Sequence, residues 1–226
     1  MEYKNKIVCF IDILGFREMV EENISDPLNI YSILSKISTE ITDWHGAPIS
    51  SNLDLVITQF SDSIVFSFVP SMHYFMQFSF FKGLSIKMVM DGVVLRGGIT
   101  YGKIFHNSDF VFGPAMNKAY ELEHKVAVFP RIVIDQSALD LKNEDGKTVT
   151  DFSGQVLFKT KALGYSFIDY INNVFAYTDE IEYYRKLRVI IIKGLETKCS
   201  RVKEKYEWMK KEYNEAKTNF PKLEEL

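Results

Sequence analysis

Near the start of the chain lies an apolar run, residues 7–14, that is interrupted by a single charged residue, Asp12. A short continuous run of this kind, followed by a glycine, predicts a buried β-strand, here over Lys6–Ile13. Two later runs, Leu53–Phe60 and Ile64–Val69, are joined by a polar turn that contains Asp62. Their lengths and the turn between them predict a β-hairpin. The pattern therefore places one aspartate at the end of a strand and another at the tip of a hairpin.

The segments between and after these strands alternate between helical and extended patterns. Leu28–Trp44 has isoleucine or leucine at helical spacing, and 72–90 is rich in phenylalanine and methionine, so both are predicted to be helices packed on the core. A glycine-rich strand, a helix from Pro114, a short strand and helix, a polar loop and two last strands follow. Their expected ranges are 93–106, 114–123, 130–135, a helix through Leu141, 142–151, 155–159 and 165–170.

The last part of the chain is highly charged and has apolar residues three, four and seven positions apart from Ile181 to Met209. This spacing predicts one long amphipathic helix over Asp179–Phe220. Such a helix is too long to bury its apolar side wholly on one domain, so we expect it to wrap around the domain or a second subunit. The predicted division is a globular domain over residues 1–175 and a helical extension over residues 176–226.

The composition is ordinary for a soluble protein, with 226 residues, 46% hydrophobic, 25% charged and a formal net charge of −3. This charge gives no reason to expect nucleic-acid binding. Cys9 and Cys199 do not suggest a disulfide framework, which fits a reducing compartment. No run approaches the roughly 18 apolar residues needed to span a membrane, and the first residues lead into a strand rather than a signal peptide. We therefore expect a cytoplasmic protein with no membrane insertion.

Asp12 and Asp62 are the main candidates for chemistry. A carboxylate at a strand end has exposed oxygens on a rigid base, and two side by side can hold Mg²⁺ or Mn²⁺ together with substrate phosphates. Taken singly, each aspartate is more often a turn former or a cap. The turn Ile13–Phe16 opens a helix, so its backbone amides are candidates for binding an anion, although a plain strand-to-helix connection has the same pattern.

The glycine-rich strand and the helix after it add further candidates. Glycines within a strand, here Gly97, Gly98 and Gly102, indicate close approach of another backbone or of a ligand. Arg96 beside them is a candidate for contacting phosphate, and pairing with a carboxylate is an equal alternative. Asn117, in the first turn of the helix, can donate a hydrogen bond to a ligand or can be an ordinary surface residue.

Five short motifs of this chain occur in an order known from one enzyme family. Phe10–Phe16 has the pattern Phe-x-Asp-Ile-x-Gly-Phe, Phe60–Ser63 has an aspartate before an apolar strand, and Leu95–Gly102 contains Arg-x-Gly-Ile-x-x-Gly. Gly113–Ala119 is close to Gly-x-x-Val-Asn-x-Ala, and Phe158–Lys161 to Val-Lys-Gly-Lys. The chain thus resembles the catalytic domain of class III nucleotidyl cyclases, the adenylate and guanylate cyclases. The resemblance implies an α+β fold, a ferredoxin-like α/β sandwich with a mixed, mostly antiparallel central sheet.

The resemblance also implies a metal-dependent active site. Asp12, Asp62 and the Ile13 carbonyl would hold two divalent ions, Mn²⁺ or Mg²⁺, on a nucleoside triphosphate substrate. Asn117 would orient the ribose of that substrate. In this family the sites lie at the interface of a head-to-tail homodimer and take residues from both subunits.

The same resemblance implies residues that bind the phosphates. Backbone amides in the turn after the first strand would cradle phosphate, and a lysine late in the domain would neutralise its charge. The predicted residues are Leu14, Gly15 and Phe16 for the amides, and Lys161 or Lys159 for the lysine.

Two departures from the family pattern concern the base. Four residues before the second aspartate, purine cyclases have lysine or glutamate, and this chain has Thr58. Seven residues before the asparagine, they have aspartate, threonine or cysteine, and this chain has Phe110. A short hydroxyl and an aromatic ring do not reproduce the hydrogen bonds to a purine edge. With its compact length, this pattern resembles the pyrimidine cyclases of bacterial Pycsar anti-phage systems. Their product, cyclic UMP or cyclic CMP, activates a separate effector; we expect UTP rather than CTP as substrate.

A third departure concerns the transition state. Four residues after the asparagine the wider family has an arginine, and this chain has Glu121. We expect another cation to substitute, with Arg131, Arg96 and Lys125 as candidates. Two alternatives are a purine cyclase with an unusual pocket and a catalytically inactive, cyclase-like module that binds nucleotide or dimerises.

Overall fold

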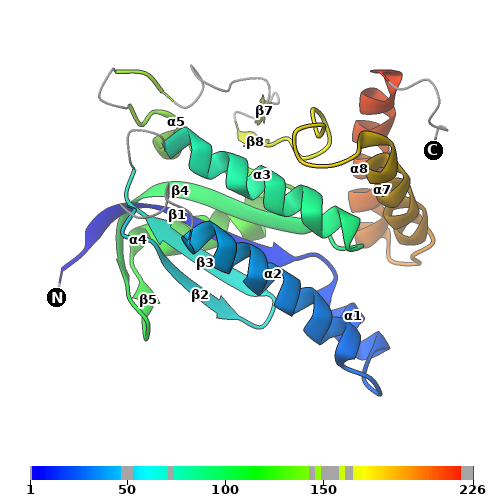
Figure 1. Cartoon of the computed structure of the whole chain (residues 1–226), viewed down its shortest axis with the longest axis horizontal. Coiled ribbons are helices and arrows are strands. Elements are labelled where there is room, and N and C mark those ends of the chain that lie inside the picture. Colours follow the sequence, from blue (N-terminus) through cyan, green and yellow to red (C-terminus); the bar gives the residue numbers. More distant parts are fainter. Residues whose placement is uncertain are drawn as a thin grey trace.

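The computed structural model describes residues 2–46, 53–70, 74–142, 146–148, 158–160, 165–219 and 226. A sheet forms the centre of the molecule, in the order β2-β3-β1-β4-β6-β8-β7, with β5 paired to β4 outside this path (Figure 1). The strands are β1 (Lys4–Ile13), β2 (Val56–Phe60), β3 (Ser63–Phe68), β4 (Leu95–His106), β5 (Val111–Phe112), β6 (Ile132–Ile134), β7 (Phe158–Thr160) and β8 (Ser166–Ile168).

Neighbouring strands of the sheet are antiparallel except for one pair, β4 and β6, which is parallel. The predicted mixed, mostly antiparallel sheet and the α+β class are confirmed. The hairpin is confirmed as well, since β2 and β3 pair in register from Val56 with Ser67 to Phe60 with Ser63. Ser61 at its tip has φ 54°, the left-handed conformation of a tight turn.

The helices are α1 (Phe16–Glu22), α2 (Leu28–Gly46), α3 (Tyr74–Met90), α4 (Pro114–Glu121), α5 (Gln136–Leu139), α7 (Glu180–Leu195) and α8 (Ser200–Ala216). Helix α4 continues into a π-helical turn, η2 (Leu122–Val126), and α8 into a 3₁₀ turn, η3 (Lys217–Asn219). Strand β1 shows how the layers arise. Its residues alternate between the two faces, so Cys9 and Ile11 join one hydrophobic cluster while Val8 and Phe10 join another.

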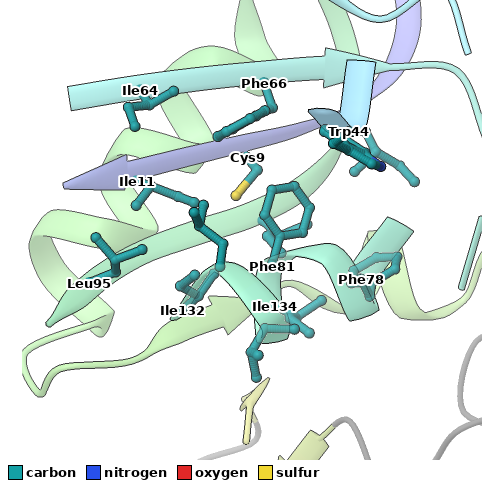
Figure 2. Packing of buried hydrophobic residues seen from close by; sticks show 14 of the residues in the cluster. Cys9, Ile11, Trp44, Ile64, Phe66, Phe78, Phe81, Leu95, Ile132 and Ile134 are labelled. Atoms are coloured by element: carbon teal, nitrogen blue, oxygen red, sulfur yellow. The ribbon is translucent and has the colours of Figure 1, made fainter. Parts of the chain in front are cut away.

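The first of these clusters lies between the sheet and the two long helices α2 and α3. Figure 2 shows Trp44 of α2 beside Phe66 of β3 and Phe81 of α3, with Cys9 of β1 among them. The Trp44 ring stacks on Phe80 at 4.0 Å between centroids. Phe78, Phe80, Phe81 and Met88 of α3 are therefore core residues, as the sequence predicted. On the opposite face of the sheet, α4 packs through its two alanines, Ala115 and Ala119.

The prediction of a single long helix over Asp179–Phe220 is wrong. The segment forms two helices, α7 and α8, that fold back on each other around a turn at Glu196–Cys199. Gly194 explains the close packing of this hairpin, because a Cβ at this position would lie 2.2 Å from the ring of Tyr206. The fold-back at this turn halves the length of the apolar stripe, so one domain can cover it.

The hairpin packs on the rest of the protein instead of extending away from it. The hydroxyl of Tyr183 donates to the Tyr170 carbonyl at 2.6 Å, and that of Tyr184 to the Ile171 carbonyl at 2.8 Å. Trp208 and Met209 of α8 are buried in the same cluster as Phe167 of β8. In Figure 1 the hairpin closes the end of the molecule near α1. Among the described helices, none is long and apolar enough to cross a membrane.

Candidate functional site

The register of the sheet brings the two aspartates together. Asp12 is the second-last residue of β1 and lies opposite Arg96 of β4. On its other side β1 pairs with β3, where Ile11 faces Ile64, so the tip of the β2–β3 hairpin with Asp62 reaches the same end of the sheet. The carboxyl groups of Asp12 and Asp62 are close enough to share a hydrogen bond. The site is thus built from two strand ends that are far apart in sequence.

The protonation of Asp12 is shifted by these surroundings. Burial raises its pKa, and the hydrogen bond with Asp62 raises it further, whereas the Arg96 guanidinium lowers it; the resulting pKa is about 7. Two carboxylates in contact repel each other when both are charged, and either a shared proton or a bound cation relieves that repulsion. The Asp12 side chain retains 15% exposure, so its oxygens are accessible.

Arg96 links the aspartate pair to an acidic residue that the sequence did not single out. Its Nη2 lies 2.9 Å from Oδ2 of Asp12, and its Nε also donates to that oxygen, at 3.1 Å. The same Nη2 forms an ion pair with Oε1 of Glu123 at 2.6 Å, and the Glu123 side chain is only 4% exposed. Of the two roles left open for Arg96, the structure therefore shows the pairing with carboxylates.

A glycine explains how Glu123 reaches Arg96. A Cβ on Gly98 of β4 would lie 2.5 Å from both the Ala119 carbonyl oxygen and the Leu122 Cβ. Only a glycine lets the end of α4 and the π-helical turn lie this close to the strand. The close approach predicted for the glycine-rich strand is here that of another backbone. π-Helical turns of this kind are often found at functional sites.

The turn after β1 is less open to phosphate than predicted. The Leu14 amide donates to the Val94 carbonyl at 2.9 Å, so it is already used within the fold. Gly15 has φ 76° and precedes the first residue of α1, Phe16. A left-handed residue at this point turns the chain sharply from strand to helix. The amides of Gly15 and Phe16 are the remaining candidates for an anion.

Thr58, the residue predicted to face the base, belongs to a short chain of hydrogen bonds. Its Oγ1 lies 2.9 Å from Nε2 of His106 on β4, and Nδ1 of the same ring lies 2.8 Å from Oγ of Ser67 on β3. Burial, together with the charge of Lys6, lowers the pKa of His106 to about 4. The ring is therefore neutral near pH 7, and it fixes the rotamer of the Thr58 hydroxyl.

The two other residues predicted to face the substrate are on the surface of this single chain. Phe110 is 63% exposed in the turn before β5, where the Asn107 side chain accepts hydrogen bonds from the backbone amides of Asp109 and Phe110. Asn117 is exposed on the first turn of α4. Both side chains are available for contacts from outside the chain.

The cations proposed to replace the missing arginine lie in very different environments. Arg131 is 9% exposed and its guanidinium lies within 6 Å of the ring centroids of Phe129, Phe167 and Trp208. Such an enclosed cation stabilises the packing of α8 on the sheet, so the prediction of Arg131 as a catalytic group is not supported by its position. Lys125 pairs with Glu121 at 2.7 Å on the surface of α4 and η2.

The lysines predicted to bind phosphate late in the domain are only partly described. Lys161 lies outside the described residues, and for Lys159 the backbone alone is described, in β7 at the far edge of the sheet. Sequence patterns also missed Lys205 on α8. It interacts electrostatically with Asp12, Glu123, Glu18 and Arg96. Lys205 is far in sequence from Asp12 and Arg96, and Glu123 is far from Arg96, the motif residues with which they interact. No local pattern therefore identified them.

The aspartate pair fits a divalent cation in part. Within the described ranges there is no group of three or more His, Cys, Asp or Glu side chains that could hold a metal ion. Asp12 and Asp62 supply two hard oxygen ligands, and ions such as Mg²⁺ usually complete their shell with water, backbone carbonyls and substrate phosphates. Two carboxylates alone leave room for such further ligands, and Ile13 at the end of β1 stays the predicted carbonyl ligand.

Comparison with known proteins identifies the fold. No protein-family model and no curated protein matches the sequence. Solved structures do: the catalytic core of a rhodopsin-guanylyl cyclase with converted specificity, in complex with ATPalphaS, has a TM-score of 0.50 and 14% identity, over 74% of this chain and 97% of that one. A bacterial light-regulated adenylyl cyclase gives a TM-score of 0.50 and 15% identity, over 84% of this chain and 58% of that one. The chain has the fold of nucleotidyl cyclase catalytic domains.

Proposed function

We propose that this protein is a metal-dependent nucleotidyl cyclase that converts a pyrimidine nucleoside triphosphate, UTP or CTP, into the 3′,5′-cyclic monophosphate and pyrophosphate. The observation that carries the proposal is the contact between the carboxyls of Asp12 and Asp62 in a fold shared with guanylyl and adenylyl cyclases. Five motifs of the sequence support it, because they occur in the order of that family and contain both aspartates.

The reaction joins the ribose 3′-oxygen to the α-phosphorus and breaks the bond from that phosphorus to the pyrophosphate oxygen, while the 3′-hydroxyl proton is released. When bound, divalent ions would lower the pKa of the attacking hydroxyl and stabilise negative charge on the leaving group. Asp12, Asp62 and the Ile13 carbonyl hold the ions in this proposal. The amides of Gly15 and Phe16 bind phosphate, Asn117 orients the ribose, and Lys161 or Lys159 neutralises the phosphates.

The preference for a pyrimidine rests on Thr58 and Phe110. The Thr58 hydroxyl lies 2.9 Å from the neutral His106 ring, which fixes its orientation, and a single short hydroxyl cannot match the several donors and acceptors of a purine edge. A purine edge that loses its hydrogen bonds on burial costs about 1–3 kcal/mol per unmatched group. The exposed ring of Phe110 offers a face on which a small base can stack. UTP is our favoured substrate over CTP.

The proposal includes a homodimer with composite sites. Several aromatic side chains are exposed near the α4 side of the sheet and the hairpin tip, which supports an interface there. They are Phe60, 80% exposed, Phe110, 63%, Tyr120, 50%, and Phe112, 41%. The cyclic nucleotide would act in the cytoplasm as a second messenger that activates a separate effector protein in defence against phage, as the resemblance to Pycsar cyclases suggests.

The test is an incubation of the purified protein with all four ribonucleoside triphosphates and Mn²⁺, followed by mass spectrometry of cyclic monophosphates. A dominant cyclic UMP or cyclic CMP product is the expected result. A purine product would retain the cyclase and overturn the base preference. Binding of nucleotide with no cyclic product would overturn the enzymatic function.

One observation favours a second candidate, an inactive module that binds nucleotide. Where the wider family has its transition-state arginine, Glu121 forms an i,i+4 ion pair with Lys125 at 2.7 Å. Glu121 reverses the charge at this position, and its carboxylate pairs with a neighbour on the same helical segment. The incubation described above separates the two candidates, because the inactive module gives stabilisation by nucleotide without turnover.

A further inference from the structure

The C-terminal hairpin packs directly on the turn that follows the first aspartate. Leu14, two residues after Asp12, packs against the same hydrophobic cluster as Leu195 at the end of α7 and Tyr206 of α8. Lys193 Nζ of α7 lies 3.7 Å from Glu22 Oε2 of α1. In Figure 1 the turn between α7 and α8 lies near the end of β1 and α1. The hairpin therefore lies beside the segment that follows Asp12.

Lys205 is the residue of α8 that interacts electrostatically with the charges of the site. Lys205 directly precedes Tyr206, whose ring packs against Gly194. The Lys205 side chain is half-buried. Burial and the Arg96 guanidinium lower the pKa of Lys205, while Glu123, Asp12 and Glu18 raise it. Glu18 also acts on Tyr206, so α1 and α8 face each other here. The Lys205 ammonium group thus lies within electrostatic range of three carboxylates and one guanidinium.

The three cations proposed to replace the missing arginine are engaged elsewhere in the fold. Arg96 is held by Asp12 and Glu123, and its charge is balanced by them. Lys125 pairs with Glu121 and is directed along the surface of η2. Arg131 is enclosed by aromatic rings. A triphosphate carries more negative charge than the phosphate-binding amides can balance, and a flexible ammonium group is well suited to neutralise it.

We propose that Lys205 binds the phosphate groups of the substrate at the Asp12–Asp62 site, so that the C-terminal hairpin contributes a substrate-binding residue. The proposal rests on the proposed function, in that a nucleoside triphosphate occupies the site. It makes α8 part of the active site. A cation held by Asp12 would weaken the attraction of this carboxylate for Lys205 and leave the ammonium group available to the phosphates.

The test measures phosphate binding without turnover. Inorganic tripolyphosphate with Mn²⁺ is the main probe, because it has the charge of the substrate and no base or ribose. Binding is measured by isothermal titration calorimetry on the full chain, for the wild type, Lys205→Gln, Lys205→Arg and Lys203→Gln. Lys203 is the matched control, since it is on the same helix and exposed. Thermal unfolding of each variant checks that the fold is kept.

We expect Lys205→Gln to weaken tripolyphosphate binding about 10-fold or more, Lys205→Arg to retain it within about 3-fold, and Lys203→Gln to leave it unchanged. A role of Lys205 only in balancing the carboxylates would lower the unfolding temperature without this loss of affinity. Equal affinity of the wild type and Lys205→Gln, or no binding of tripolyphosphate to the wild type, would overturn the proposal.

The same variants separate this proposal from the proposed function. If the wild type forms a cyclic nucleotide and Lys205→Gln does so with an unchanged KM, the cyclase function holds and the role of Lys205 fails. If no cyclic nucleotide forms but tripolyphosphate binding depends on Lys205, the phosphate site holds and the cyclase function fails. Should Lys205→Gln unfold, Lys205→Met in the presence of stabilising salt gives the same comparison, because it keeps the length of the side chain and removes its charge.

Discussion

Arg96 faces Asp12 across the pairing of β4 with β1, and its Nη2 lies 2.9 Å from the Asp12 carboxylate. The same nitrogen lies 2.6 Å from Glu123, so one guanidinium is shared between two carboxylates. This sharing has a consequence for metal binding. When a cation takes the oxygens of Asp12, Arg96 still has Glu123 as a partner and is not left as an unpaired buried charge.

Replacing either aspartate by asparagine is expected to abolish turnover. Asp12→Asn and Asp62→Asn each remove an anionic ligand, and we expect cyclic-nucleotide formation to fall at least about 100-fold. Mass spectrometry of the product with Mn²⁺ is the measurement. Asp43→Asn, on the exposed side of α2, is the control and should retain activity. Full activity in Asp12→Asn would show that the reaction does not use this pair.

Loss of Glu123 is expected to destabilise the protein more than loss of its exposed neighbour. Glu123→Ala removes one of the two partners of a largely buried guanidinium, and we expect a decrease of about 1–3 kcal/mol in the free energy of unfolding. Glu121→Ala is the control, because its ion pair with Lys125 has a 48% exposed carboxylate and surface pairs contribute about 0.5 kcal/mol or less. Urea unfolding of both variants gives the comparison; equal decreases would contradict a special role for Glu123.

The packing of the π-helical turn on β4 makes Gly98 intolerant of a side chain. In Gly98→Ala the new methyl would meet the Ala119 carbonyl oxygen at 2.5 Å, so α4 must shift. We expect a loss of about 1–3 kcal/mol in stability, together with a loss of activity from displacement of Glu123. Gly46→Ala, where nothing lies within 4 Å, is the control and should be neutral. Thermal unfolding and product formation are measured on both, and a stable, active Gly98→Ala would refute the argument.

Thr58 is expected to influence the choice of base. Thr58→Val keeps the shape of the side chain and removes the hydroxyl that meets His106 at 2.9 Å. If this hydroxyl positions or contacts the base, kcat/KM for the pyrimidine triphosphate should fall about 5- to 100-fold, corresponding to about 1–3 kcal/mol. Competition among the four triphosphates in one reaction measures it. Unchanged ratios among the products would place the base elsewhere.

Protonation of His106 is expected to lower the free energy of unfolding at acidic pH. Its pKa in the folded protein is about 4, below the value of 6.5 typical of an exposed histidine, because of burial. Between these values the unfolded chain binds the proton and the folded protein does not. The contribution of His106 to the free energy of unfolding is therefore present above about pH 6.5 and is lost as the pH falls toward 4. Urea midpoints from pH 4.5 to 8 should show a shallower decline for His106→Gln than for the wild type. His45→Gln, at an exposed position, should follow the wild type.

Local patterns predicted most of the elements of this fold. The apolar run with Asp12 became β1, the hairpin around Asp62 became β2 and β3, and the phenylalanine-rich segment became α3. These predictions succeeded because each depends on periodic burial along one element. The single C-terminal helix failed for the same reason, since periodicity continues through α7 and α8 and only a polar turn separates them.

The sequence by itself determined the strands that end in Asp12 and Asp62, the glycines that permit close packing, and the resemblance to a cyclase domain. Only the tertiary structure decided which charges meet. Strand register placed Arg96 between Asp12 and Glu123, and the C-terminal hairpin brought Lys205 to the same charges. The physical reason is that period and turn chemistry act over a few residues, whereas an ion pair depends on how distant elements pack. Arg131, a candidate by charge alone, is enclosed by aromatic rings because packing, and not residue type, sets the surroundings of a cation.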